Sequence, residues 1–196
     1  MLGRPEDDAT TPSAFLDAFV SSYMADGTTE YVADQPGGHG PEGAREMLHR
    51  LLRSSEAESS TERCWNWRHP TLGIERTLRN RGHDYNGFPV SSGYFGSYSM
   101  DALAMALHCF YHTTSFNAAV VKCVNFCGDA DTTGAITAQL CGAFYGLDTI
   151  EPAWLEQLHK WDQQQIELRA VCLVHAKAFG SAGGTGDSAG GTGDGS

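Results

Sequence analysis

Apolar residues recur at intervals of three and four along most of this sequence, and no long stretch alternates apolar and polar residues with period two. The first spacing lines one face of a helix, whereas a half-buried strand needs the second. Clear examples of the helical spacing begin at Phe15, Met47, Met100 and Phe116. We therefore expect an all-α fold in which several helices pack around one core.

Local signals indicate where individual helices begin. Thr11-Pro12 combines an N-cap threonine with a proline in the first turn, where its missing N–H costs nothing. Thr114-Ser115 caps the helix that starts near Phe116. Beyond that helix, Gly134, Ala138, Gly142 and Ala143 are small residues about one turn apart, so the helix that carries them can lie close against its neighbours.

Two more helices are expected after residue 150. Pro152 starts the first, Asp162 caps the second, and Gly180 ends it. The residues we expect them to bury are Trp154, Leu155 and Leu158 in the first, and Ile166, Ala170, Leu173 and Val174 in the second.

Both ends of the chain differ from its middle. Residues 1–11 are polar, and the segment Ser-Ala-Gly-Gly-Thr-Gly-Asp occurs twice in succession near the C-terminus, with nothing apolar to bury. We therefore expect a flexible N-terminus over 1–11, a helical domain over 12–179 and a disordered tail over 180–196.

A cluster of oxygen-bearing side chains lies between two of the expected helices. Asp129 and Asp131 are two residues apart, so in an irregular turn both carboxylates can point at one ion. Thr132 can add a neutral oxygen, and hard oxygen ligands suit Mg²⁺ or Ca²⁺. Gly128 and Gly134 remove Cβ where the chain must bend tightly or approach a bound group closely.

Two familiar metal loops fit this cluster poorly. A Ca²⁺ EF-hand loop requires a bidentate carboxylate at its twelfth position, where this sequence has Leu140. A haloacid-dehalogenase-type Asp-x-Asp-x-Thr motif follows a buried strand, whereas the residues from Phe116 to Cys127 have helical spacing.

A third pattern covers more of the chain. Residues 128–136, Gly-Asp-Ala-Asp-Thr-Thr-Gly-Ala-Ile, and residues 139–146, Gln-Leu-Cys-Gly-Ala-Phe-Tyr-Gly, resemble the C-terminal metal motif of the ADP-ribosylglycohydrolase family. Residues 92–103, Ser-Gly-Tyr-Phe-Gly-Ser-Tyr-Ser-Met-Asp-Ala-Leu, resemble that family's nucleotide-contacting loop and the helix after it. The resemblance runs roughly over 86–173.

This resemblance implies an orthogonal multi-helix bundle and an enzyme that hydrolyses the glycosidic bond between ADP-ribose and an acceptor. Two Mg²⁺ ions bind the ribose hydroxyls and the attacking water in such a site. Asp129, Asp131 and Thr132 match the C-terminal metal ligands, and Gly93 and Tyr94 match positions that contact ADP-ribose. The implied partner is an ADP-ribosylated protein or a small molecule that contains ADP-ribose.

The sequence also departs from the family pattern. Family members carry a Thr-Asp-Asp motif well upstream, and the only candidate here, Glu6-Asp7-Asp8, lacks the threonine. We therefore expect a chain truncated at its N-terminus that binds Mg²⁺ weakly, because that ion keeps its waters unless several hard ligands converge. Two hypotheses follow: a hydrolase that is complete only in a longer form or with ligands from another chain, and a catalytically inactive module that binds ADP-ribose or a protein partner.

Charge and hydropathy exclude other functions. A formal charge of −11 and a pI near 5.0 would repel a nucleic-acid backbone or an anionic membrane. No apolar run approaches the roughly 18 residues of a membrane-spanning helix, and no signal peptide opens the chain. We therefore expect a cytoplasmic protein.

Three further groups of residues have alternative interpretations. His108 and His112 have the i, i+4 spacing of a zinc pair, but no third ligand accompanies them, so zinc is not expected. Trp65 and Trp67 either line a substrate cleft or pack in the core. The six cysteines show no C-x-x-C spacing, and most lie among apolar residues, which is typical of reduced structural thiols.

Overall fold

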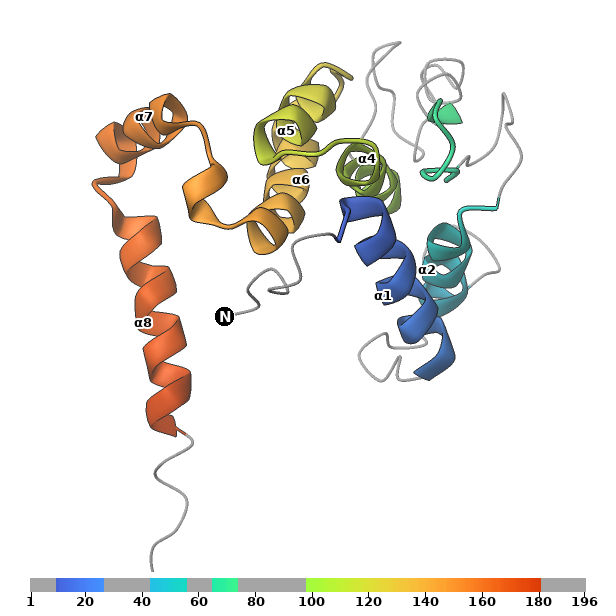
Figure 1. Cartoon of the computed structure of the whole chain (residues 1–196), viewed down its shortest axis with the longest axis horizontal. Coiled ribbons are helices and arrows are strands. Elements are labelled where there is room, and N and C mark those ends of the chain that lie inside the picture. The colour runs from blue at the N-terminus through green and yellow to red at the C-terminus, as the bar shows by residue number, and fades with distance from the viewer. Residues whose placement is uncertain (1–9, 27–42, 56–64, 74–97, 181–196) are drawn as a thin grey trace, which may run out of the picture. The chain divides into compact units, whose positions relative to one another are not determined.

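The computed structural model describes residues 10–26, 43–55, 65–73 and 98–180, and within these ranges the regular structure is helical, with no strand. The prediction of an all-α fold is therefore confirmed. The helices are α1 (Pro12–Asp26), α2 (Ala44–Arg53), α4 (Ser99–Tyr111), α5 (Phe116–Val124), α6 (Ala130–Tyr145), the short 3-10 helix η2 (Leu147–Thr149), α7 (Pro152–Asp162) and α8 (Gln165–Gly180) (Figure 1).

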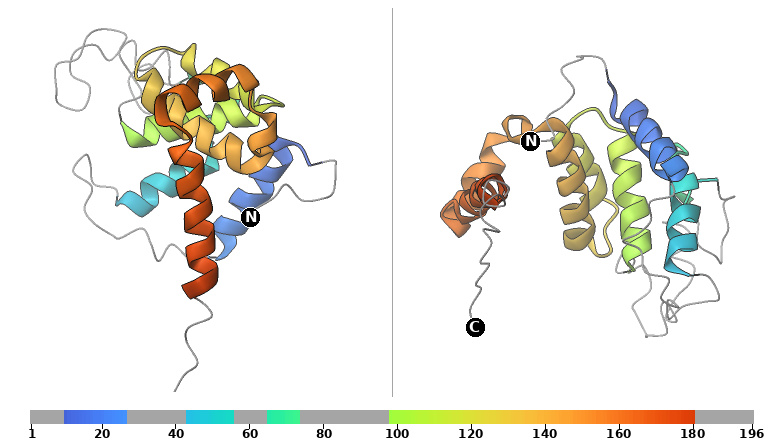
Figure 2. Two further views of the ribbon diagram at one scale, coloured as in Figure 1. Left: turned by 90° about the vertical axis from the view of Figure 1, so that its left-hand side faces the viewer. Right: turned by 90° about the horizontal axis from the view of Figure 1, so that it is seen from below.

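The chain divides into two compact units, Met1–Ile150 and Glu151–Ser196. In the first unit, α4 lies between the α5–α6 pair and the α1–α2 pair (Figure 2). Nine of its 13 residues are buried, including Ala104, Met105, Ala106 and Cys109. A helix that is apolar on every side needs neighbours on every side, so α4 is the centre of this unit.

The start of α1 follows the predicted signal. The Thr11 Oγ1 atom accepts a hydrogen bond of 3.2 Å from the Ala14 backbone N–H, and Pro12 occupies the first turn. Leu16 and Val20 are buried in the core, whereas Phe15 and Phe19 remain partly exposed. Only part of the apolar face of α1 is therefore buried against the core.

Helices α5 and α6 pack closely, as the run of small residues predicted. A Cβ atom on Gly134 would lie 3.2 Å from Val124 Cγ1, and one on Gly142 would lie 3.8 Å from Phe116 Cε2. Ser115 caps α5 by accepting a hydrogen bond of 3.2 Å from the Ala118 N–H. Gly134 thus permits a close approach of two helices.

Trp65 and Trp67 both have 0% exposure, so the core-packing interpretation is correct and the cleft-wall alternative is wrong. Each indole N–H meets an acceptor inside the protein. Trp65 Nε1 donates to Asp101 Oδ1 at 2.8 Å, and Trp67 Nε1 donates to the Leu51 carbonyl at 2.8 Å. Their hydrogen bonds are satisfied, so burying these large rings carries no unpaired donor.

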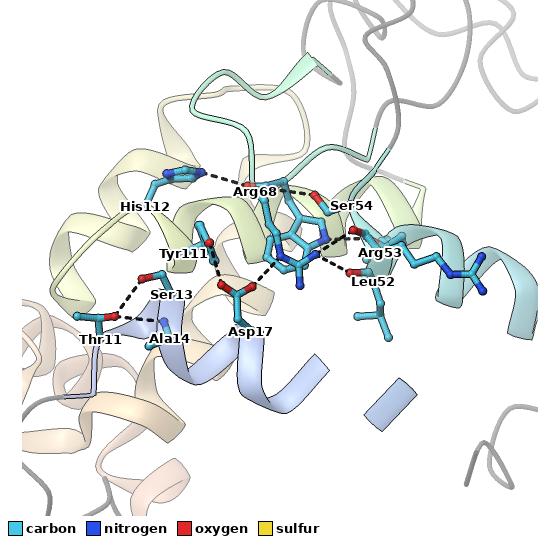
Figure 3. Close-up of polar contacts among 12 residues, drawn as sticks. Thr11, Ser13, Ala14, Asp17, Leu52, Arg53, Ser54, Arg68, Tyr111 and His112 are labelled. Carbon is cyan, nitrogen blue, oxygen red and sulfur yellow. Dashed lines mark hydrogen bonds and ion pairs between the residues drawn. The ribbon is translucent and has the colours of Figure 1, made fainter. Parts of the chain in front are cut away.

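Arg68 connects three parts of the first unit (Figure 3). Its Nε atom donates to Asp17 Oδ1 of α1 at 2.7 Å, and its Nη1 atom donates to the carbonyls of Leu52 and Arg53 at 2.9 and 3.0 Å. Those carbonyls lie at the C-terminal end of α2 and have no partner within the helix. The guanidinium also lies 4.0 Å from the centre of the Trp67 ring.

The second unit contains α7 and α8. Pro152 begins α7, and Asp162 caps α8 by accepting hydrogen bonds of 3.0 Å from the N–H groups of Gln164 and Ile166, as predicted. His159 Nε2 lies 2.7 Å from Glu167 Oε1 and joins the two helices.

The predicted burial in this unit is wrong. No α7 residue is buried, and Trp154 and Leu158 are 38% and 40% exposed. In α8, Ile166, Leu173 and Val174 are more than half exposed, and Ala170 is exposed as well. Two helices can cover only part of each other's surface, so helical spacing alone does not ensure burial.

Several predictions lie outside the described residues. These include most of the flexible N-terminus, nearly all of the Gly-rich tail and the Glu6-Asp7-Asp8 candidate. The domain boundaries at 12 and 179 stay a prediction. Among the helices of the described ranges, none has the length and apolar character that crossing a membrane requires.

Replacing Arg68 by Met should lower the free energy of unfolding by about 2 kcal/mol, because two helix-end carbonyls and the Asp17 carboxylate lose their charged donor. Urea unfolding measures this change. The matched control is Arg53→Met, which removes an exposed ion pair with Glu46 at 3.7 Å and should change stability by no more than about 0.5 kcal/mol. Equal effects of the two substitutions would contradict the role assigned to Arg68.

Candidate functional site

The predicted metal ligands lie at the turn from α5 to α6. Cys127 and Gly128 both have left-handed backbone conformations, with φ of 65° and 66°, and Asp129 is the N-cap residue of α6. Glycine adopts such a φ freely, which explains Gly128. Asp129 and Asp131 therefore follow a sharp reversal of the chain and lie at the positive end of the α6 dipole.

The two carboxylates converge. The side chains of Asp129 and Asp131 are in hydrogen-bonding contact, and this contact lowers the pKa of Asp131. The backbone N–H groups of Thr132 and of Asp131 itself add to the lowering. Asp131 is exposed and Asp129 partly exposed. Carboxylates this close repel each other unless a proton or a cation lies between them, so the pair is a candidate cation site.

The threonines in the first turns of α6 differ in their exposure to solvent. Thr132 is exposed beside the carboxylates, whereas Thr133 and Thr137 are fully buried. The Thr133 hydroxyl donates to the Asp129 carbonyl at 2.9 Å, and the Thr137 hydroxyl donates to the Thr133 carbonyl at 2.9 Å. The first group can serve as a ligand, while the other two support the helix beneath it.

The donor set fits part of a hard-cation site. Asp129, Asp131 and Thr132 offer oxygen atoms, which Mg²⁺ and Ca²⁺ prefer. Within the four described ranges, no group of three or more His, Cys, Asp or Glu side chains is placed to hold a metal ion. These residues can therefore supply some, and not all, of the ligands that Mg²⁺ requires.

The two alternative metal loops do not match the structure. Leu140, at the position where an EF-hand needs its last carboxylate, lies within α6. The segment before Asp129 is the helix α5, where a haloacid-dehalogenase-type site would have a strand. The structure thus agrees with the sequence in excluding both.

The other predicted site residues, Gly93 and Tyr94, lie outside the described residues. Sequence reasoning missed the burial of two polar side chains, Thr133 in α6 and Asp101 in α4. For Thr133, the only signal in the sequence was its position next to Thr132. The carboxylate of Asp101 lies in the first turn of α4, a position that also suits an exposed dipole partner, so no local pattern indicates its burial.

His108 and His112 form a structural pair. Their rings lie 4.5 Å apart, and His108 Nδ1 and His112 Nε2 both meet the Trp67 carbonyl, at 3.0 and 3.2 Å. Burial, with the charge of Lys122 as the next cause, lowers the pKa of His108 to about 3 and also lowers that of His112. Both rings are thus neutral donors to one backbone oxygen at neutral pH.

Comparison with known proteins identifies the chain's relatives. The model of the family described as ADP-ribosylglycohydrolase matches residues 6–181. The chain is 34% identical over 87 residues to the ADP-ribosyl-[dinitrogen reductase] glycohydrolase of Rhodospirillum rubrum, which covers 44% of this chain and 30% of that protein. It is 36% identical over 73 residues to the ADP-ribosylarginine hydrolase Tri1 of Pseudomonas putida (strain GB-1), covering 37% of this chain and 18% of that protein.

A third relative is the ADP-ribosylarginine hydrolase Tri1 of Serratia proteamaculans (strain 568), 37% identical over 68 residues, which are 35% of this chain and 18% of that protein. The chain thus spans less than a third of the length of each of these relatives. No solved structure matches it.

The buried histidines predict how stability depends on pH. The folded protein holds His108 at a pKa of about 3 against an ordinary value of 6.5, so the unfolded chain takes up a proton first as the pH falls. Stability present above pH 6.5 should be lost toward pH 3, by up to about 1.4 kcal/mol per pH unit.

Urea unfolding between pH 7 and pH 4 checks this prediction. His108→Asn, whose amide can still donate to the Trp67 carbonyl, should flatten the pH dependence, whereas His175→Asn on the exposed surface of α8 should leave it unchanged. A wild-type slope that persists in His108→Asn would contradict the assignment.

Proposed function

Because this chain belongs to the ADP-ribosylglycohydrolase family, we propose that it takes part in hydrolysing the glycosidic bond between ADP-ribose and an acceptor. The observation that carries the proposal is the contact between the carboxylates of Asp129 and Asp131 at the exposed N-terminus of α6, inside the matched residues. A solvent-facing pair of acidic side chains held this close is suited to bind a cation, and through it a sugar.

We propose Mg²⁺ as the cation and Asp129, Asp131 and Thr132 as three of its ligands. The oxygen donors and their exposure support this choice. Mg²⁺ bound in such a site lowers the pKa of a water molecule and holds hydroxyl groups of the substrate in place. The remaining ligands must come from residues outside the described ranges, from a longer form of the protein or from a second chain.

The chain's own residues then have distinct tasks. The backbone N–H groups of Thr132 and Asp131 contribute to lowering the pKa of Asp131, so they favour its charged, metal-binding form. Asp129 adds the second charge from the N-cap position. The Thr133 hydroxyl holds the Asp129 carbonyl at 2.9 Å, so the turn that carries both carboxylates stays attached to the buried part of α6.

We propose an ADP-ribosylated arginine side chain of a protein as the first substrate to test. Two relatives are named as ADP-ribosylarginine hydrolases, and a third is named for ADP-ribosyl-[dinitrogen reductase]. Gly93 and Tyr94 are proposed to contact the ADP-ribose. Arginine, serine and free ADP-ribose esters would present the same ribose to the carboxylates, so the acceptor must be identified by experiment.

One observation favours a second candidate function. No third acidic, histidine or cysteine side chain joins the carboxylate pair within the part of the chain that the structure describes. A protein with this incomplete ligand set would bind ADP-ribose or a partner without cleaving the glycosidic bond. The two functions differ in a single measurable property, the release of ADP-ribose.

Isothermal titration calorimetry should give a Kd for Mg²⁺ of about 1 mM or weaker, because two carboxylates and a hydroxyl replace few of the waters of this ion. Asp131→Asn should remove the binding, since it deletes one of the two charges. Asp148→Asn is the matched control, because Asp148 is an exposed aspartate on η2 outside the pair. Tight binding of two ions would contradict the incomplete ligand set.

Arginine and serine peptides carrying ADP-ribose test the reaction itself at saturating Mg²⁺. We expect release of ADP-ribose from the arginine peptide, reduced by about 100-fold or more in Asp131→Asn with an unchanged circular dichroism spectrum. Full activity of Asp131→Asn would refute its assigned role. Binding of ADP-ribose without release would establish the second function in place of the first.

A further inference from the structure

The second unit leaves most of helix α8 uncovered. Among the α8 side chains that the structure describes, residues 165–175, Glu167 is partly buried and the other ten are exposed. Five of the exposed side chains are large and apolar, and each is between 53% and 73% exposed: Ile166, Leu168, Val171, Leu173 and Val174. Successive helical residues turn by about 100°, so these five side chains point to several sides of α8.

A helix of this composition needs neighbours. Isolated helices shorter than about 12–15 residues are marginal in water even when they are rich in alanine, and longer ones still depend on packing. Helix α8 has 16 residues, among them the β-branched Ile166, Val171 and Val174, which lower its helix propensity further. It meets α7 through Glu167, which lies 2.7 Å from His159. Since a helix that is apolar on several sides is normally buried, α8 requires further partners.

Helix α7 presents apolar side chains as well. Trp154, Leu158 and Trp161 are 38%, 40% and 91% exposed, and no residue of α7 is buried. Their spacing of four and three residues places them along one side of the helix. We call the exposed apolar side chains of α7 and α8 together the α7–α8 surface (Figure 1). Exposed apolar side chains gathered in this way mark an interaction surface, and exposed tryptophans are frequent anchors of protein contacts.

Charge indicates what kind of partner this surface fits. Residues 151–180 contain four acidic and three basic side chains, a net charge of −1, whereas the whole chain carries −11. Lys160 Nζ lies 2.9 Å from Glu156 Oε1, so part of this charge is already paired within α7. An anionic membrane would repel a chain of −11, and a nearly neutral surface does not attract a strongly charged protein. The matching partner is therefore apolar and nearly neutral.

We propose that the α7–α8 surface binds the α7–α8 surface of a second copy of this chain, so that two helix pairs pack into one four-helix contact with twofold symmetry. Such a contact pairs a surface with itself and so requires self-complementarity. Apolar side chains meet this condition, and the low net charge of 151–180 makes it the part of an acidic chain where two copies can approach with little repulsion. The partner's two helices supply the neighbours that α8 needs. The proposal does not rest on the hydrolase activity.

Size-exclusion chromatography with light scattering tests the full chain over a dilution series. The mass should be twice 21.1 kDa at high concentration and fall toward 21.1 kDa on dilution. Leu173→Glu should raise the Kd of the dimer by about 100-fold or more, because the twofold contact then holds an unpaired charge from each copy. Leu147→Glu is the matched control, since Leu147 is 52% exposed on η2 in the first unit, and it should leave the Kd unchanged.

Tryptophan fluorescence of the wild-type chain gives a second, independent measurement. Trp65 and Trp67 have 0% exposure, so a change of emission on dilution reports on Trp154 and Trp161. Dilution should shift the emission to longer wavelength as the dimer separates, and Trp161→Phe should remove most of that shift. Circular dichroism verifies that each variant is folded.

Four outcomes would overturn the proposal. They are a wild-type chain that is monomeric at every concentration, a dimer that folded Leu173→Glu retains, a dimer that Leu147→Glu weakens equally, and an emission maximum that does not change on dilution. A monomer that sediments with phosphatidylcholine vesicles would assign the α7–α8 surface to a lipid bilayer instead.

Discussion

The close approach of α5 to α6 is the constraint on which the candidate site depends. Gly134 allows it, because a Cβ atom there would lie 3.2 Å from Val124 Cγ1. With the two helices this near, the five residues between them must reverse the chain at once, which explains the left-handed conformations of Cys127 and Gly128. The reversal leaves Asp129 and Asp131 at the first turn of α6 and in contact. Packing in the core thus determines the positions of two charges at the surface.

Electrostatics explains why these two charges can persist together. The chain has a formal charge of −11, so a further pair of adjacent carboxylates is unfavourable unless local groups offset the repulsion. The backbone N–H groups at the start of α6 supply part of that offset to Asp131. A bound cation would supply the rest. The same arrangement that tolerates the pair in the protein is therefore compatible with the divalent ion that we propose for it.

Much of this arrangement could be predicted from the sequence, and the exceptions have a common cause. Hydrophobic periodicity and capping residues predicted the helices α1, α5 and α6, because these signals depend on residues that are close together in the sequence. The partners of Arg68 and Trp65 lie far away in sequence, 51 residues for Asp17 and 36 for Asp101, and no local pattern encodes such contacts. For the same reason, helical spacing predicted burial for apolar residues of α7 that the described part of their unit covers only partly.

Aspartates in this protein show why residue type alone does not identify a site. Asp101 lies in the first turn of α4, as Asp131 does in α6, but it has 0% exposure and accepts a hydrogen bond of 2.8 Å from the Trp65 indole. Its Oδ1 atom faces the indole donor inside the core, so a cation would have to displace that bond and cross the core to reach it. Asp131 is exposed and contacts a second carboxylate. Of these two first-turn aspartates in the described residues, Asp131 is the one that has both solvent access and a neighbouring carboxylate, as the proposed cation site requires.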